Sequence, residues 1–170
     1  MKSVKINLEH LNHNKDAMFR NILTNLEAIS KNYLEIRKLE MESKQYKPFK
    51  EHYEQYRNQY PELNSAILQN HLRNMDSMIK SYISWCKKKH KLITFPSKTK
   101  VSIPLRNDSF HFQWNDETKF FDAWLKFLKT YFPMKLCNYH KKSLQEAISF
   151  GDSSIYLDSK GKITLRLVFK

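Results

Sequence analysis

The chain has 170 residues, of which 41% are hydrophobic and 14% aromatic, with two glycines and five prolines. This composition excludes a disordered protein and a glycine-rich phosphate loop, and the length suits one domain or two small lobes. Thirty Lys and Arg against 17 Asp and Glu give a net charge of +13, which predicts a polyanionic partner, with nucleic acid as the first candidate.

The chain opens with a strand pattern and continues with a helix pattern. Apolar and polar residues alternate from Val4 to Leu8, the two-residue period of a half-buried strand. Asn12 or Asn14 can then cap a long helix by accepting hydrogen bonds from its first amides. The apolar positions of this helix recur at steps of three and four residues, as in a helix that packs on another helix. They are Phe19, Ile22, Leu26, Ile29, Tyr33 and Ile36.

Two further helices should follow, one on each side of Pro61. Pro48 suits the first turn of the earlier helix, which should extend to about Tyr60 and, being poor in aliphatic residues, should be only partly buried. The later helix should run from about Glu62 to Lys89 and again has an apolar stripe with steps of three and four. The stripe residues are Leu68, Leu72, Met75, Ile79, Tyr82 and Cys86.

The period then changes from helix to strand. Alternation over residues 101–105 and 110–114 predicts two strands joined by Asn107 and Asp108. Residues 117–132 are ambiguous, because their aromatic residues have helical spacing but also suit a strand. A short helix is favoured there.

The end of the chain has a hairpin pattern. Residues 154–157 and 163–169 flank the turn from Asp158 to Gly161, in which Gly is placed for a positive φ. If the opening strand joins this hairpin, the fold is α+β, with a helical lobe of about three helices inserted into a small antiparallel β-barrel or sheet. The expected segments are 1–9 for the first strand, 10–92 for the helical lobe and 93–170 for the rest of the β domain.

Positive charge is concentrated in the middle of the chain. Between Ser77 and Asn107 there are eight bases and no acid, which predicts contact with phosphates. The bases are Lys80, Lys87, Lys88, Lys89, Lys91, Lys98, Lys100 and Arg106. A second basic group could extend the same surface: Lys135, His140, Lys141 and Lys142. Four aromatic rings could either stack on bases or pack in a core: Trp85, Phe110, Phe112 and Trp114.

No pattern of catalytic residues stands out. Six acids lie in expected turns or helix starts, where they should cap backbone amides: Asp108, Asp116, Glu117, Asp122, Asp152 and Asp158. The seven histidines lack zinc spacing, so no catalytic residue, metal or cofactor is expected. Two alternatives stay open: a small independent metal-dependent nuclease using the scattered acids, and a helical module that docks a protein through the Phe19 to Ile36 stripe.

Cys86 and Cys137 are the two cysteines and do not form a CxxC pair, which fits a reducing cytosol. The first residues lack the apolar run of a signal peptide, and no stretch is long enough to span a membrane. The sequence therefore predicts a soluble cytoplasmic protein with no membrane partner.

One segment resembles a known family. Leu68-Gln69-Asn70-His71-Leu72-Arg73-Asn74-Met75, followed by Lys80 and Tyr82 and then by Phe95-Pro96-Ser97-Lys98, resembles the pattern L-Q-N-x-L-x-N-L…A-x-K-x-F-F…F-P-R-F-K. This pattern belongs to the TnpB (OrfB) family of transposon-encoded RNA-guided nucleases. In that family a wedge β-barrel is interrupted by a helical recognition lobe and followed by a RuvC-like nuclease with a zinc ribbon.

The resemblance implies that the helix carrying Gln69 faces the target-adjacent DNA motif, where a Gln amide can pair with adenine. Ser65 and Ala66 would lie beside it, and Lys80, Lys98 and Lys100 would meet phosphates of guide RNA or DNA. Asn70 and Arg73, off the apolar stripe, belong to the same expected interface.

The family's catalytic acids and zinc cysteines lie beyond the hairpin, and this sequence stops at Lys170. The expectation is a non-catalytic recognition half from a transposable element, associated with the nucleoid. Its expected partners are guide RNA and DNA, with a separate RuvC-like nuclease half as a further candidate.

Overall fold

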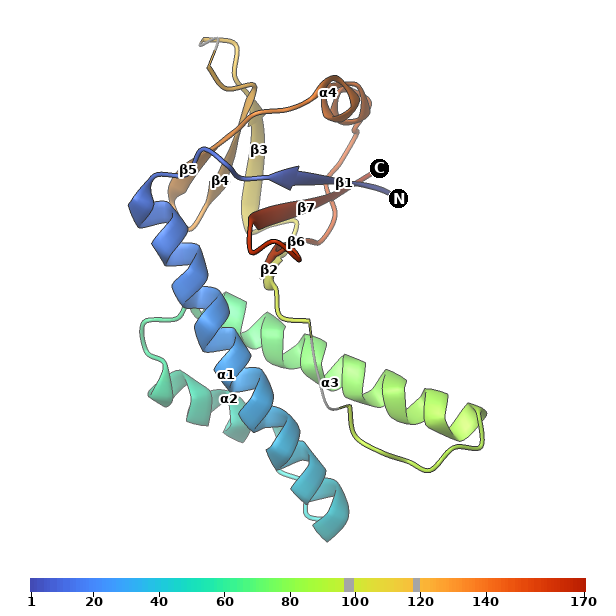
Figure 1. Cartoon of the computed structure of the whole chain (residues 1–170). Helices are drawn as coiled ribbons and strands as arrows, with labels where there is room; N and C mark the ends of the chain where they lie inside the picture. The colour runs from blue at the N-terminus through green and yellow to red at the C-terminus, as the bar shows by residue number, and fades with distance from the viewer. Residues whose placement is uncertain (97–99, 118–119) are drawn as a thin grey trace. The chain divides into compact units, whose positions relative to one another are not determined.

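The computed structural model describes residues 1–96, 100–117 and 120–170. The elements follow the order β1 (Lys2–Asn7), α1 (His13–Ser43), α2 (Phe49–Gln59), α3 (Ser65–Lys88), β2 (Ile103–Leu105), β3 (Phe110–Trp114), β4 (Ala123–Phe127), β5 (Thr130–Met134), α4 (Asn138–Gln145), β6 (Ser153–Leu157) and β7 (Ile163–Phe169) (Figure 1). This mixture of helices and antiparallel sheets confirms the α+β class.

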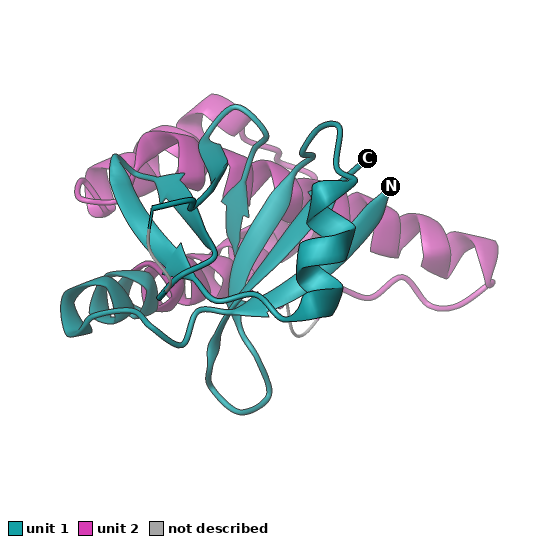
Figure 2. Ribbon diagram, turned by 90° about the horizontal axis from the view of Figure 1, so that it is seen from above, with its two compact units in different colours: residues 1–21, 102–170 teal, residues 22–101 magenta. Residues whose placement is uncertain are grey.

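The chain forms two compact units (Figure 2). Unit 1 consists of residues 1–21 and 102–170, and unit 2 of residues 22–101. The first turns of α1 thus group with the strands, so the boundaries lie at residues 21 and 101, where the sequence analysis placed them at 9 and 92.

The larger sheet of unit 1 joins the two ends of the chain. Its strand order is β1-β7-β6-β2, and β1 pairs antiparallel with β7, so that Val4 lies opposite Leu167. The tight β6–β7 turn contains Gly161 at a φ of 72°, and the carboxylate of Asp158 accepts hydrogen bonds from the amides of Lys160 and Lys162. The predicted opening strand and closing hairpin are confirmed, and the sheet stays open rather than closing into a barrel.

The second sheet, in the order β3-β4-β5, corrects two expectations. The short helix favoured for residues 117–132 is wrong, because the described part of this segment holds β4 and the start of β5. Leu128 and Lys129, at φ of 49° and 60°, supply the two positive φ values of a two-residue hairpin loop without the usual Asn-Gly. The strands at 103–105 and 110–114 exist but lie in different sheets, since β2 pairs with β6 and β3 with β4.

The helices bury the stripes that the sequence predicted. The Asn12 carboxamide accepts from the amide of Lys15 and caps α1, and the Asn64 carboxamide accepts from Ala66 and Ile67 at the start of α3. Along α1 the stripe is buried except at its half-buried last member, Ile36, and along α3 it is buried except at the half-buried Tyr82. The alternative of a module docking a protein through the α1 stripe therefore loses its surface, because the chain itself covers the stripe.

A polar network joins the three helices of unit 2. Arg37 Nη1 lies 2.7 Å from Glu40 Oε2, and Arg37 Nε lies 3.2 Å from Asp76 Oδ1. Glu40 also approaches His52, with 2.8 Å between Oε1 and Nε2, and the Tyr33 hydroxyl donates to Asp76 at 2.8 Å. Burial, together with this bond to Asp76, raises the pKa of Tyr33, so the hydroxyl stays protonated as a donor. We call these five residues the unit 2 network.

Candidate nucleic-acid interface

Helix α3 presents a polar face that carries much of the predicted site. Gln69, Arg73, Lys80 and Lys87 follow one another at steps of four, seven and seven residues, so they project from one side of the helix. The three bases are exposed, and Gln69 is half-buried at the edge of this side. At about 1.5 Å per residue, the face spans roughly 27 Å. We call it the α3 face.

The end of α3 is held by a turn that sends the chain back. The amide of Lys91 donates to the carbonyl of Cys86 at 3.0 Å, and the amide of His90 donates to the carbonyl of Lys87 at 3.2 Å. His90 adopts a φ of 50°, the left-handed position of a Schellman motif. This turn places Lys91 beside the last turn of the helix.

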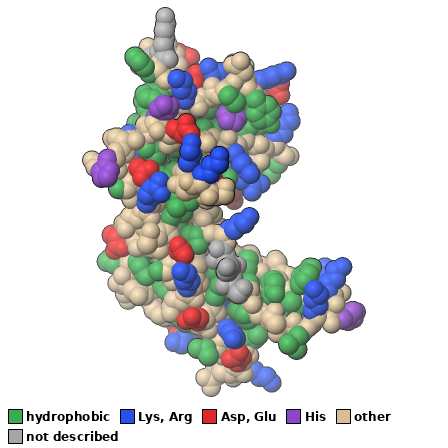
Figure 3. Space-filling model, in the orientation of Figure 1, with side chains coloured by type: hydrophobic (Ala, Val, Ile, Leu, Met, Phe, Trp, Pro, Cys, Tyr) green, Lys and Arg blue, Asp and Glu red, His purple; other side chains and the backbone are tan. Residues whose placement is uncertain are grey.

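Four exposed lysines surround this turn: Lys87, Lys88, Lys89 and Lys91. Within the described residues, none of them lies within 4.0 Å of a carboxylate oxygen. The negative end of the helix dipole compensates part of this charge, but its effect fades within one turn. Figure 3 shows Lys and Arg side chains gathered at this end of α3. We call the four lysines with Trp85 the α3 tip.

The other predicted bases are divided between the two units. Lys100 is exposed in unit 2, and Lys98 lies outside the described residues. The remaining four, all in unit 1, are Arg106, Lys135, Lys141 and Lys142.

Two of those four bases are neutralised. Arg106 lies 3.0 Å from Asp108, and Lys141 lies 2.5 Å from Asp122. Lys135 and Lys142 are exposed. The unit 1 group is therefore a weaker candidate for binding phosphates than the α3 tip.

The remaining predicted positions lie at the start of α3. Ser65 and Ala66 are exposed in its first turn, and Asn70 is half-buried. Arg73 stands over the ring of Phe49, with 5.7 Å from the guanidinium carbon to the ring centroid. Through this contact with Phe49, α2 helps to orient the Arg73 side chain of the α3 face.

Of the four aromatic candidates, Trp85 is the one that stays exposed, at 44%. Phe110 is buried, and both Phe110 and Phe112 contact the ring of Phe150. The ring of Trp114 meets the ring of Phe112 edge to face. Phe110 therefore packs in the core of unit 1, Phe112 and Trp114 are half-buried, and Trp85 is the most exposed of the four rings.

The structure adds residues that the sequence analysis missed. The Tyr82 hydroxyl lies 3.1 Å from Thr94 Oγ1, so residue 94 returns to the side of α3. Pairing of β1 with β7 sets Lys5 opposite Arg166, two exposed like charges. The Lys5–Arg166 pair depends on the register of β1 against β7, which joins the two ends of the chain, so local sequence patterns could not have revealed it.

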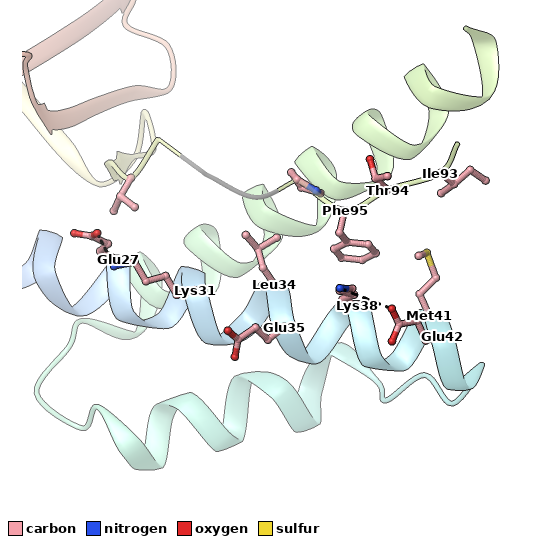
Figure 4. Close-up of a pocket in the computed structure, with 12 residues that line it drawn as sticks. Glu27, Lys31, Leu34, Glu35, Lys38, Met41, Glu42, Ile93, Thr94 and Phe95 are labelled. Carbon is pink, nitrogen blue, oxygen red and sulfur yellow. Dashed lines mark ion pairs between the residues drawn. The ribbon is translucent and has the colours of Figure 1, made fainter. Parts of the chain in front are cut away.

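A groove of about 750 Å³ lies between α1 and the segment that carries Ile93, Thr94 and Phe95 in unit 2 (Figure 4). Leu34 and Phe95 line its apolar part. Met41, Ile93, Thr94, Pro96 and Val101 also line it, as do charged residues of α1, among them the ion pairs Lys31–Glu27 at 3.0 Å and Lys38–Glu42 at 3.9 Å. Because its bases are already paired with carboxylates, this groove does not suit a polyanion.

Several acids weighed for the nuclease alternative have structural roles. The Asp122 carboxylate accepts from the amide of Leu136, and the Asp152 carboxylate accepts from the amide of Asn107. With the Asp158 turn, this confirms backbone capping for three of the six. Among the described residues, no group of three or more His, Cys, Asp or Glu is arranged to hold a metal ion.

A serine and a histidine meet inside unit 2. Ser30 Oγ lies 2.8 Å from His71 Nε2 and also donates to the carbonyl of Leu26. Both side chains are buried, with 1% and 5% exposed, so a substrate has no access to the pair. Burial lowers the pKa of His71 to about 4, which keeps the ring neutral.

This low pKa predicts a specific loss of stability in acid. The unfolded state takes up the His71 proton near pH 6.5, and the folded state only near 4, so stability falls as pH drops between these values. The full effect is about 3 kcal/mol. Urea unfolding of His71→Leu between pH 7 and 4 should show a correspondingly smaller pH dependence than the unsubstituted chain. The exposed His111→Leu serves as control, and equal pH dependence in all three proteins would contradict the assignment.

No protein-family model matches the chain, and no curated protein matches it. In the part of the chain that the structure describes, no helix is both long and apolar enough to cross a membrane.

Proposed function

We propose that this protein binds nucleic acid through α3, with the α3 face and the α3 tip as one interface. The observation that carries the proposal is the row of Arg73, Lys80 and Lys87 on one side of a helix that ends in four exposed lysines without a carboxylate partner among the described residues. Exposed bases on one rigid element can neutralise several phosphates together, and the released counterions favour binding.

The resemblance to the TnpB family supports a narrower form of the proposal. In this form the chain is the recognition half of an RNA-guided transposon nuclease and binds guide RNA and target-adjacent DNA. Gln69 would read an adenine edge, the surrounding bases would hold phosphates, and a RuvC-like nuclease half would carry out cleavage. The binding half itself would perform no catalytic step.

The salt dependence of binding tests the general proposal. Six contacts, from Arg73, Lys80 and the four lysines of the α3 tip, give a slope of about −5 for log K against log salt on duplex DNA. Affinity for a mixed-sequence DNA duplex or an RNA hairpin should therefore fall about a thousandfold between about 50 and 200 mM salt. Fluorescence anisotropy of a labelled probe measures this fall. A flat dependence over that range contradicts the proposal.

A further inference from the structure

Trp85 is presented to solvent by the turn that ends α3. Its side chain is 44% exposed, while Cys86 beside it is 1% exposed. The chain then returns along the same side of the helix, with Lys91 over the indole and Thr94 at the Tyr82 hydroxyl. The residues between them, Leu92 and Ile93, are 85% and 41% exposed. The α3 tip therefore combines positive charge with exposed apolar surface.

The indole of Trp85 is held in one orientation. Lys91 Nζ lies 4.8 Å from the ring centroid, a cation–π contact, and the Tyr82 ring lies alongside at 6.0 Å with an interplanar angle of 33°. A ring fixed before binding loses little conformational entropy when a second flat group stacks on it. Trp85 is thus a preorganised stacking platform.

The ligand that matches this platform offers a flat ring and negative charge together. An unpaired nucleotide does so, because its base face is free and its phosphates flank it. A duplex offers the phosphates but keeps its base faces inside the stack. A lipid surface would engage the ring and the lysines, but Gln69, Arg73 and Lys80 project from nearly the opposite side of α3 and would point away from a bilayer that holds Trp85. Lys87 belongs to both the α3 face and the α3 tip, so a flexible unpaired strand that passes around the end of the helix can reach Trp85 and the α3 face together.

We propose that the α3 tip binds unpaired nucleotides, with Trp85 stacked on a base and Lys87, Lys88, Lys89 and Lys91 on the flanking phosphates. This inference rests on the proposed function and adds to it a preference for single-stranded nucleic acid at this end of the helix.

The test uses Trp85 as the only fluorescent indole, in a Trp114→Phe/Trp124→Phe variant. Probes are oligo(dT) of about 12 nucleotides, an abasic strand of the same length and charge, and a blunt duplex. Oligo(dT) should quench Trp85 fluorescence, and the abasic strand should not. In the unsubstituted chain, Trp85→Ala should weaken oligo(dT) binding by about 5- to 150-fold, the range for one stacked base. Binding of the duplex should change less than twofold, and Trp85→Phe should retain most of the oligo(dT) affinity.

The outcomes separate this inference from the proposed function. If Trp85→Ala weakens the abasic strand and oligo(dT) equally, or if oligo(dT) binds without quenching, the stacking role is wrong while nucleic-acid binding stands. If none of the three probes binds, the proposed function fails as well. If oligo(dT) does not bind but vesicles of phosphatidylserine and phosphatidylcholine shift the Trp85 emission to the blue, the α3 tip is a lipid contact and the inference is overturned.

Discussion

Replacing Lys87, Lys88 and Lys89 together with Gln should weaken binding to a DNA duplex or RNA hairpin roughly 100-fold, from about 1 kcal/mol for each lost phosphate contact. The slope of log K against log salt should become shallower by about 3, because three fewer counterions are released. Gln is a good helix former, so α3 should persist to its present end. Anisotropy titrations at several salt concentrations measure both quantities, and circular dichroism checks the helix content.

A matched control separates this local effect from the overall charge. Lys31, Lys38 and Lys50 also lie in unit 2, and each forms an i,i+4 ion pair with a Glu. Their triple replacement with Gln changes the net charge by the same amount but should reduce affinity only a few-fold, through weaker long-range attraction. Equal losses for the two triple variants would show that the protein binds by its total charge and that the α3 tip is not the interface.

The helices were predictable because their signals are local. The three- and four-residue steps of α1 and α3 are visible in the sequence, and the structure buries those positions except the half-buried Ile36 and Tyr82. The start of α3 was placed near Glu62 because of Pro61, whereas the Asn64 side chain caps the helix and Ser65 begins it. Such an error of a few residues is typical when two candidate start signals lie close together.

The β4–β5 hairpin was missed because its loop lacks the usual sequence signal. Leu128 and Lys129 are unfavourable at positive φ, so nothing in the sequence marked a turn. The two-residue period of β4 was present, with Ala123, Leu125 and Phe127 buried, but Phe121 and Trp124 also fitted a helical spacing. α4 was missed for another reason: Leu144 is its one buried residue, so it has no apolar stripe.

Sheet partners depend on pairings between distant residues, which local patterns do not encode. The segments at 103–105 and 110–114 both read correctly as strands, yet Ile103 lies opposite Ile155 and Phe110 opposite Phe127. The entropic cost of closing a longer loop rises only slowly with its length, so it does not choose between these partners. The choice depends on which pairing lets the apolar faces of the strands fit together in the core. The sequence therefore predicted the elements better than their arrangement.

The candidate site also has features that local sequence patterns predict and features that depend on the fold. The acid-free band after Ser77 is a local property of the sequence, and the structure shows its described lysines exposed. The neutralisation of Lys141 by Asp122 needed the fold, since Asp122 precedes β4 and Lys141 lies in α4 of unit 1. The distinction between exposed Trp85 and packed Phe110 also needed it. The proposed interface accordingly rests on α3, where local pattern and structure agree.

Replacing Glu40 with Ala should destabilise the protein by about 3–5 kcal/mol, the usual cost of removing one partner from a buried charged pair. Glu40 is 6% exposed and bonds Arg37 through one oxygen, while its other oxygen lies 2.8 Å from His52 and accepts from the Lys47 amide. Its loss leaves the Arg37 guanidinium with Asp76 as its one remaining carboxylate partner within the unit 2 network. Urea unfolding followed by circular dichroism at 222 nm measures the effect, since unit 2 is helical.

Glu42, two residues further along α1, supplies the matched control. It pairs with Lys38 at 3.9 Å, and both side chains are more than half exposed. Its replacement with Ala should cost about 0.3–0.5 kcal/mol, as for other exposed i,i+4 pairs. Glu40→Gln should fall between the two, because the amide keeps an acceptor for Arg37 but loses the charge. A cost for Glu40→Ala close to that of Glu42→Ala would show that packing of the apolar stripes alone holds the three helices together.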